Sequence, residues 1–193
     1  MSADLLSRIK DDQVYFVSLQ FIDILGNIKS VTLPADQVER ALNDGIWFDG
    51  SSIEGFARIY ESDLVLVPDP ITYRVLPWSA PERRRARLFC DVYGPDGEPS
   101  SRDPRTALKR MMAKAADMGY VYNTGPELEF FIFERSNNDS IHPVPHDVVG
   151  YFDFSPRDRA QQVRSEIVLA LKALRIEVEM SHHEVATGQH EID

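Results

Sequence analysis

Apolar and β-branched residues in the first half of the chain follow the short, turn-bounded pattern that is typical of strands. The predicted strands are residues 14–22, 28–33, 63–67 and 86–93. A turn at Leu25–Asn27 joins the first two, which predicts a β-hairpin. A helix is predicted between Pro34 and Gly45, because proline favours the first helical turn and glycine favours a helix end.

The pattern changes after a linker that is rich in glycine, proline and serine and ends near Asp103. Asp103 followed by Pro104 is typical of a helix start, and apolar residues at helical spacing continue to Gly119. One long strand is predicted at 120–134 and a second helix at 155–174. The remaining predictions are a polar loop at 135–150 and two short strands within 176–193. We therefore predict two α+β units, with domains at 1–103 and 104–193.

Composition narrows the class of protein. The 193 residues include 21 Lys+Arg and 31 Asp+Glu, a net charge of −10, which disfavours nucleic acid and anionic membranes as partners. No apolar run approaches the ~20 residues that a membrane span needs, and residues 1–12 lack the pattern of a secretory signal. The single cysteine, Cys90, is expected to be a buried strand residue and is typical of a reducing compartment. We expect a soluble cytoplasmic protein.

Two glutamates interrupt the apolar stretch at 125–133. Residues two apart in a strand share a face, so Glu127 and Glu129 are predicted to point the same way. Carboxylates inside an apolar strand are costly unless a positive group compensates them. A sheet edge with both carboxylates in water is the alternative, and this pattern alone does not decide between the two.

The last segment of the chain adds two more carboxylates. If Thr187–Gly188 is a two-residue hairpin loop, Glu184 and Glu191 lie directly opposite each other, where like charges repel. No lysine or arginine follows Arg175 to compensate them. Four such carboxylates predict a site for hard divalent cations, Mg²⁺ or Mn²⁺ rather than Zn²⁺. A solvated acidic hairpin is the alternative.

Three histidines in the same segment, His182, His183 and His190, match no closed zinc pattern, and no cysteine accompanies them. We therefore expect them to support the carboxylates or to belong to the core. Glu179 lies at the opposite strand parity from Glu184, so it is predicted to face elsewhere.

Three segments in order, residues 48–53, 125–131 and 181–191, resemble signatures of prokaryotic type I glutamine synthetase. The resemblance extends over the whole chain. It implies a β-grasp-like N-terminal domain over 1–103, followed over 104–193 by the first part of the α+β catalytic domain. It also implies ATP-dependent condensation of glutamate with ammonia through γ-glutamyl phosphate.

The same resemblance assigns the acidic residues to ligands. Glu129, Glu184 and Glu191 would hold one Mg²⁺ or Mn²⁺ ion near glutamate. Glu127 would hold a second ion, which bridges the phosphates of ATP. Glu179 would contact the nucleotide, an assignment that strand parity does not support.

Three residues of the first half also acquire roles from the resemblance. Asp49, with Ser52 nearby, would lie in a loop that reaches a neighbouring subunit and would bind and deprotonate ammonium. Arg58 resembles the arginine used for glutamine feedback in one subgroup. The family assembles from stacked rings of six, so a homododecamer is implied for the full-length protein.

One departure from the family concerns length, since the sequence reaches only Asp193, less than half of the usual family length. We therefore expect the chain alone to be inactive and the activity to belong to a longer protein. Two alternatives are a γ-glutamyl ligase for another amine and a short non-catalytic module that binds synthetase subunits or metal. Assays of ammonium against polyamines, and co-purification with a longer synthetase, would distinguish these alternatives.

Overall fold

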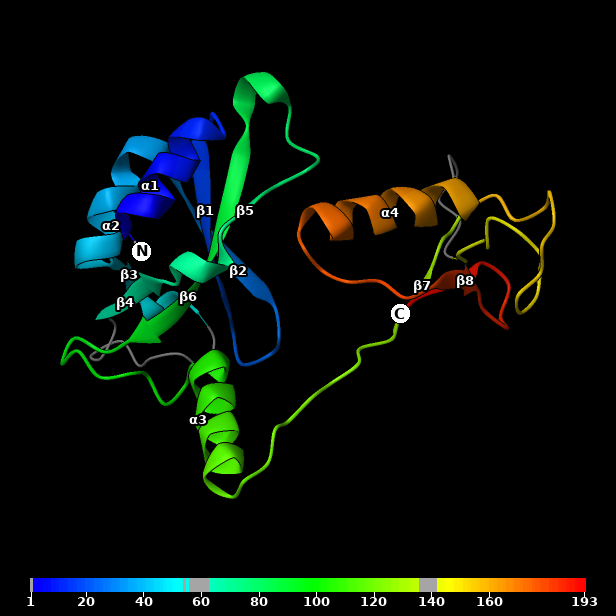
Figure 1. Ribbon diagram of the computed structural model, residues 1–193. Helices are drawn as coiled ribbons and strands as arrows, with labels where there is room; N and C mark the ends of the chain where they lie inside the picture. The colour runs from blue at the N-terminus through cyan, green and yellow to red at the C-terminus, as the bar shows by residue number, and fades with distance from the viewer. Residues whose placement is uncertain (1, 54, 56–62, 136–141) are drawn as a thin grey trace. The chain divides into compact units, whose positions relative to one another are not determined.

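The computed structural model describes residues 2–53, 55, 63–135 and 142–193. The chain forms two compact units, residues 1–122 and 123–193 (Figure 1). The mixture of helices and sheets in both units agrees with the predicted α+β class. The helix that follows Asp103 belongs to the first of these units.

The first unit contains a six-stranded sheet in the order β2-β1-β6-β4-β3, with β5 paired to β6. Its strands are β1 (Phe16–Ile22), β2 (Ile28–Pro34), β3 (Ile46–Asp49), β4 (Asp63–Pro68), β5 (Arg74–Val75) and β6 (Arg85–Tyr93). The central pair, β1 and β6, is parallel and the other pairs are antiparallel. The predicted hairpin is therefore confirmed as β1 and β2, which pair along their whole length.

Two helices, α1 (Ser2–Asp11) and α2 (Val38–Asp44), pack together against this sheet (Figure 1). A short 3₁₀ turn (Ala35–Gln37) precedes α2, and Gly45 ends it with φ of 69°, a value that glycine adopts without strain. Alternate residues of the strands, including Val17 and Leu88, point into the core between helices and sheet. Cys90 is fully buried there, as expected, and burial raises the pKa of its thiol to about 12.

Helix α3 (Pro104–Asp117) follows Asp103, whose buried carboxylate accepts hydrogen bonds from the backbone N–H groups of Arg105 and Thr106. The same carboxylate accepts a third bond from the N–H of Val92 near the end of β6, at 3.1 Å. Asp103 therefore caps the helix and fixes its start against the sheet.

The second unit contains a three-stranded antiparallel sheet in the order β7-β9-β8. Its strands are β7 (Leu128–Phe131), β8 (Ser181–His183) and β9 (Gln189–Ile192). Helix α4 (Gln161–Ala173) runs beside β8 in Figure 1, and its Arg164 contacts His190 of β9. None of the helices in the described part of the chain is long and apolar enough to cross a membrane.

Several predicted boundaries were wrong. The long strand expected at 120–134 is reduced to residues 128–131, because only this part pairs with β9, and residues 120–127 are exposed coil. Helix α4 begins at Gln161 rather than at 155, because Ser155 and Asp158 accept backbone N–H bonds in turns of their own. Among the described helices and strands, α1, β3 and β5 were not predicted. Helix α1 had a signal in Leu5 and Ile9, which lie one helical turn apart and are both buried.

Candidate metal-binding site

The sheet of the second unit presents two chemically different faces. Side chains alternate along each strand, and the register places His182 of β8 and Glu129 of β7 opposite Glu191 of the central strand β9. These three residues therefore share one face. His183 and His190, which are also paired across strands, lie on the other face with α4. The acidic side chains are thus separated from the buried histidines by the sheet itself.

The predicted register between β8 and β9 was wrong by two residues, because Glu191 lies opposite His182 and not opposite Glu184. His183, not Glu184, is the last paired residue of β8, and it lies opposite His190. The loop is longer than two residues, because the N–H of Glu184 donates to the carbonyl of Gln189 at 2.8 Å and residues 185–188 form the turn. Gly188, with φ of 70°, provides the left-handed conformation that such a loop requires.

Glu184 and Glu191 nevertheless lie close together, as diagonal neighbours on the same face. One ligand atom from each of His182, Glu184 and Glu191 can be chosen so that all three lie within 4.8 Å of one another. His182 Nε2 is 3.3 Å from Glu191 Oε2 and 3.7 Å from Asp193 Oδ2, and its Nδ1 is 3.8 Å from Glu184 Oε1. The result is an acidic cluster around one imidazole.

The electrostatics of this cluster favour a bound cation. Burial, together with the neighbouring carboxylates of Glu184 and Asp193, raises the pKa of Glu191 to about 7, and Glu191 is only 8% exposed. The N–H of Val185, which donates to Glu184 at 2.8 Å, lowers the pKa of Glu184. Two close carboxylates cannot both ionise easily unless positive charge lies between them. A divalent cation would supply that charge.

Glu129 of β7 lies on the same face of the sheet as this cluster. It lies directly across from Glu191, and its Oε2 accepts a short hydrogen bond, 2.5 Å, from the side-chain amide of Gln189. Glu127 and Glu179 are exposed and lie just before β7 and β8, respectively. The backbone N–H of Glu179 donates to the carbonyl of Asp193 at 2.8 Å, which aligns residue 179 with the end of β9.

The first unit holds Asp49 at the end of β3, with its carboxylate fixed by the short 3₁₀ turn Gly50–Ser52. Its Oδ1 accepts from the hydroxyl of Ser51 at 2.6 Å and from the N–H of Ser51 at 2.9 Å. Its Oδ2 accepts from the hydroxyl of Ser52 at 3.2 Å. These bonds, those from Ser51 first, lower the pKa of Asp49, so its carboxylate is an exposed anion. Arg58 lies outside the described residues.

Two family models together match almost the whole chain. The glutamine synthetase beta-Grasp domain matches residues 13–95, and the glutamine synthetase catalytic domain matches residues 101–193. The chain belongs to the glutamine synthetase family. The sequence resemblance is thereby confirmed, as is a β-grasp domain followed by the first part of the catalytic domain.

Curated relatives in the family are named glutamine synthetase. One from Halobacterium salinarum is 50% identical over 189 residues, which covers 97% of this chain and 42% of the relative. One from Methanosarcina mazei is 50% identical over 190 residues, with 98% and 42% covered. The chain therefore spans less than half the length of the curated relatives that it matches.

Solved structures share the fold over the full chain. One described as a GmaS/ADP complex has a TM-score of 0.81 at 26% identity, covering 100% of this chain and 44% of that one. The cryoEM structure of Plasmodium falciparum glutamine synthetase has a TM-score of 0.84 at 24% identity, covering 100% and 43%. At that identity the second comparison supports the fold alone.

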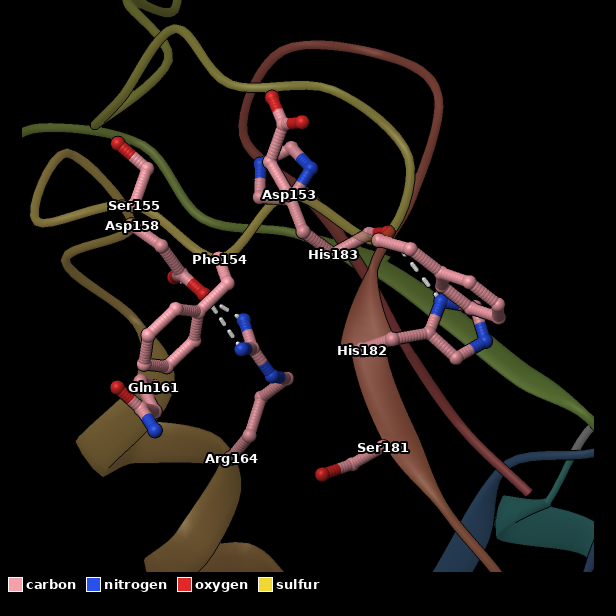
Figure 2. Close-up of a pocket in the computed structure, with 10 residues that line it drawn as sticks. Asp153, Phe154, Ser155, Asp158, Gln161, Arg164, Ser181, His182 and His183 are labelled. Carbon is pink, nitrogen blue, oxygen red and sulfur yellow. Dashed lines mark hydrogen bonds and ion pairs between the residues drawn. The ribbon is translucent and has the colours of Figure 1, made fainter.

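Within this glutamine synthetase fold, the second unit contains a group of buried charged residues that was not predicted from the sequence. A cavity of about 380 Å³ lies between the start of α4 and β8, and Figure 2 shows Asp158 and Arg164 joined on one side of it and His182 on another. Arg164 forms two bonds to Asp158, at 2.5 and 3.1 Å, and both side chains are buried. Asp147 is a further buried carboxylate. Asp158 and Arg164 both lie inside the helix predicted at 155–174, whereas Asp147 lies in the predicted loop at 135–150 and had no such signal.

Proposed function

We propose that this chain provides the glutamate-side metal site of a glutamine synthetase. The full-length protein would then join ammonia to L-glutamate with ATP, through γ-glutamyl phosphate. The observation that carries the proposal is the close approach of Glu184 and Glu191, with Glu129 directly across from Glu191 on the same face of the sheet. Membership of the family supports the reaction, and the cluster supports the place where it occurs.

The donor atoms of this cluster fit the expected ions. Carboxylate oxygens are the ligands that Mg²⁺ and Mn²⁺ prefer, and burial, together with the nearby carboxylates of Glu184 and Asp193, raises the pKa of Glu191 to about 7. Glu129, Glu184 and Glu191 would hold one ion, and Glu127 would hold a second. Bound ions stabilise charge on the transferring phosphoryl group and allow the anions ATP and glutamate to enter an acidic site. Glu179 would contact the nucleotide.

Asp49 is proposed to bind ammonium and to accept its proton, with Ser52 supporting the carboxylate. The hydrogen bonds that lower the pKa of Asp49 keep it anionic, and a carboxylate beside an ammonium ion both attracts the cation and receives the proton. In this proposal the Asp49 loop serves a neighbouring subunit of a homo-oligomer, a dodecamer in the full-length cytoplasmic enzyme. Arg58 is proposed as a regulatory residue for feedback by glutamine.

The proposal also divides the chain by function. Residues 1–103 would form the β-grasp domain that carries Asp49, and residues 104–193 would begin the catalytic domain that carries the glutamates. Because the chain spans less than half of its relatives, complete turnover belongs to the full-length protein and metal binding is the property to test in this chain.

The test is titration of the 193-residue chain with Mn²⁺, followed by calorimetry or by the electron paramagnetic resonance of free Mn²⁺. Glu191→Gln and Glu129→Gln remove a ligand charge and should weaken binding by more than the roughly 10–100-fold that loss of an outer-shell partner costs. Glu134→Gln is a matched control, because Glu134 is an exposed glutamate of the same unit that pairs only with the exposed Arg159 among the described residues.

Equal Mn²⁺ affinity in wild type and in both ligand variants would contradict the proposed site. The reaction itself is tested by extending the chain to the length of its relatives and assaying glutamine formation from ammonium. A preference for a polyamine over ammonium would replace the proposed acceptor and leave the metal site in place.

A further inference from the structure

A buried polar cluster lies behind the metal-binding face, on the side of the sheet that α4 covers. Asp147 is its centre, and its side chain is only 1% exposed. His146, His183 and His190 surround it, and the last two come from β8 and β9. Burying a carboxylate at this depth is costly unless it is hydrogen-bonded, so the contacts of Asp147 indicate what it holds in place.

One oxygen of Asp147 binds both ends of the segment that carries Glu184. Its Oδ1 accepts from Nε2 of His183 at 3.1 Å and from the backbone N–H of Gly188, also at 3.1 Å. His183 is the last residue of β8, and Gly188 is the residue before β9. A single buried atom thus fixes the loop between the two strands.

The link continues from His183 to the backbone of Glu184. Nδ1 of His183 donates to the carbonyl of Glu184 at 2.6 Å, since a carbonyl can only accept. Gly188 is equally restricted, because a Cβ at this position would lie 2.9 Å from Cβ of Pro145 and 3.0 Å from the carbonyl oxygen of Ile132. The backbone on either side of the turn therefore has little freedom to move, and Glu184 projects from it toward Glu191.

The cluster also meets the distance criterion for a metal site, since ligand atoms of His146, Asp147 and His190 lie within 4.8 Å of one another. Hydrogen bonding argues against this reading. Arg164 lies 2.8 Å from Nδ1 of His190 and can only donate, so the neutral ring carries its proton on Nε2, the atom that would have to bind the metal. Burial and the charge of Arg164 lower the pKa of His190 to about 4, which keeps the ring neutral.

We propose that Asp147 is a positioning residue that holds Glu184 and Glu191 in register for metal binding, acting through His183 and the Gly188 amide from the opposite face of the sheet. The inference rests on the proposed function, because it concerns the same metal site. It adds a residue 36 positions from His183 and 41 from Gly188 in the sequence, which touches no ligand of that site. Residues that hold metal ligands in place through hydrogen bonds orient those ligands and so govern metal affinity.

The test compares Asp147→Ala with Asp147→Asn in the 193-residue chain. Alanine removes both acceptor contacts, so Mn²⁺ affinity should fall by roughly 10–100-fold with every carboxylate of the site intact. Asparagine keeps an oxygen for His183 and Gly188, and its NH₂ can donate to Nε2 of His146, whose Nδ1 is engaged with the carbonyl of Ile132. Because Nδ1 of His183 donates to the Glu184 carbonyl, Nε2 can donate to residue 147 only from a cationic ring, which a carboxylate supports better than a neutral amide. Asp147→Asn should therefore lose less Mn²⁺ affinity than Asp147→Ala.

Asp153→Ala is the matched control, since it also deletes a carboxylate that accepts a backbone N–H, that of Gly150, but it does not contact the loop. It should leave Mn²⁺ affinity unchanged. If Asp147→Ala does not fold, His183→Gln replaces it, because glutamine cannot bond Asp147 and the Glu184 carbonyl as the imidazole does. Wild-type affinity in a folded Asp147→Ala protein would overturn the inference, and so would loss of affinity in Asp147→Asn equal to that in Asp147→Ala.

Hydrogen exchange of the 184–190 segment gives a second readout that needs no metal. Exchange at these amides should be faster in Asp147→Ala than in wild type, and Asp147→Asn should show a smaller increase. If the wild-type chain does not bind Mn²⁺, the proposed function fails while exchange still decides the positioning role. Unchanged exchange in Asp147→Ala would overturn that role, and so would a Zn²⁺ ion bound by wild type and lost from both Asp147 variants.

Discussion

The two units of this chain differ in what they bury. The first unit encloses an apolar core, to which α1, α2 and alternate strand residues contribute. Among the described residues of the second unit, the buried side chains include Asp147, Arg164, His183, His190 and Glu191. Apolar burial stabilises without a directional requirement, whereas buried polar groups contribute only when each finds its partner. The first unit therefore resembles a scaffold, and the second is built for exact placement of charged groups.

The largest loss of stability is expected when one partner of a buried ion pair is removed. Asp158→Ala leaves Arg164 buried without its carboxylate and should destabilise the second unit by about 3–5 kcal/mol. Hydrogen exchange at the amides of α4 measures the loss. Glu134→Ala breaks the exposed pair with Arg159 in the same unit and should cost at most about 1 kcal/mol. Equal costs for the two variants would contradict the contrast between buried and exposed pairs.

In the first unit, a comparable loss of stability is expected when a substitution leaves a cavity in the apolar core. Leu88 of β6 is fully buried, so Leu88→Ala should destabilise that unit by about 2–5 kcal/mol. Denaturation followed by tryptophan fluorescence reports on this unit alone, because the two tryptophans of the chain, Trp47 and Trp78, both lie in it. Leu108→Ala on the exposed side of α3 should change stability by less than about 0.5 kcal/mol. A similar midpoint for both variants would show that Leu88 is not part of a tightly packed core.

The smallest expected effect is on the stability of the second unit at acid pH. The bonds from Arg164 to Asp158 outweigh burial and lower the pKa of Asp158 below 3.8, so the native state holds its proton more weakly than the unfolded chain. The resulting stability is complete above about pH 4 and is lost as pH falls through the native pKa. Exchange at α4 between pH 5 and pH 3 measures this slope. Asp158→Asn should flatten it, and an unchanged slope would assign the acid sensitivity to other groups.

Local patterns predicted the elements whose signals lie within a few residues. The β1–β2 hairpin and the start of α3 were found because turn residues and the Asp103–Pro104 cap act locally. Strand length failed at 120–127, because a strand needs a partner and sequence alone does not show that β9 is too short to pair with those residues. Prediction succeeded where the interacting residues are close in sequence and failed where they are far apart.

The carboxylate cluster was predicted in part for the same reason. Glu184 and Glu191 are close in sequence, so their proximity was found even though the loop length and the register were wrong. Asp147 was not found, because its partners His183 and Gly188 are 36 and 41 positions away and nothing in the local pattern around Asp147 points to them. Long-range hydrogen bonds of this kind have no periodic signature.

The position of β9 in the middle of its sheet has a consequence for the order of folding. Strands β7 and β8 each pair with β9 and not with each other, so neither has a strand partner in this sheet until residues 189–192 have been synthesised. The contact between Gln189 and Glu129 closes a loop of 60 residues, a separation that slows folding. The first unit pairs β1 with β2 across a short turn and can begin to form much earlier during translation. The acidic cluster should therefore be among the last parts of this chain to assemble.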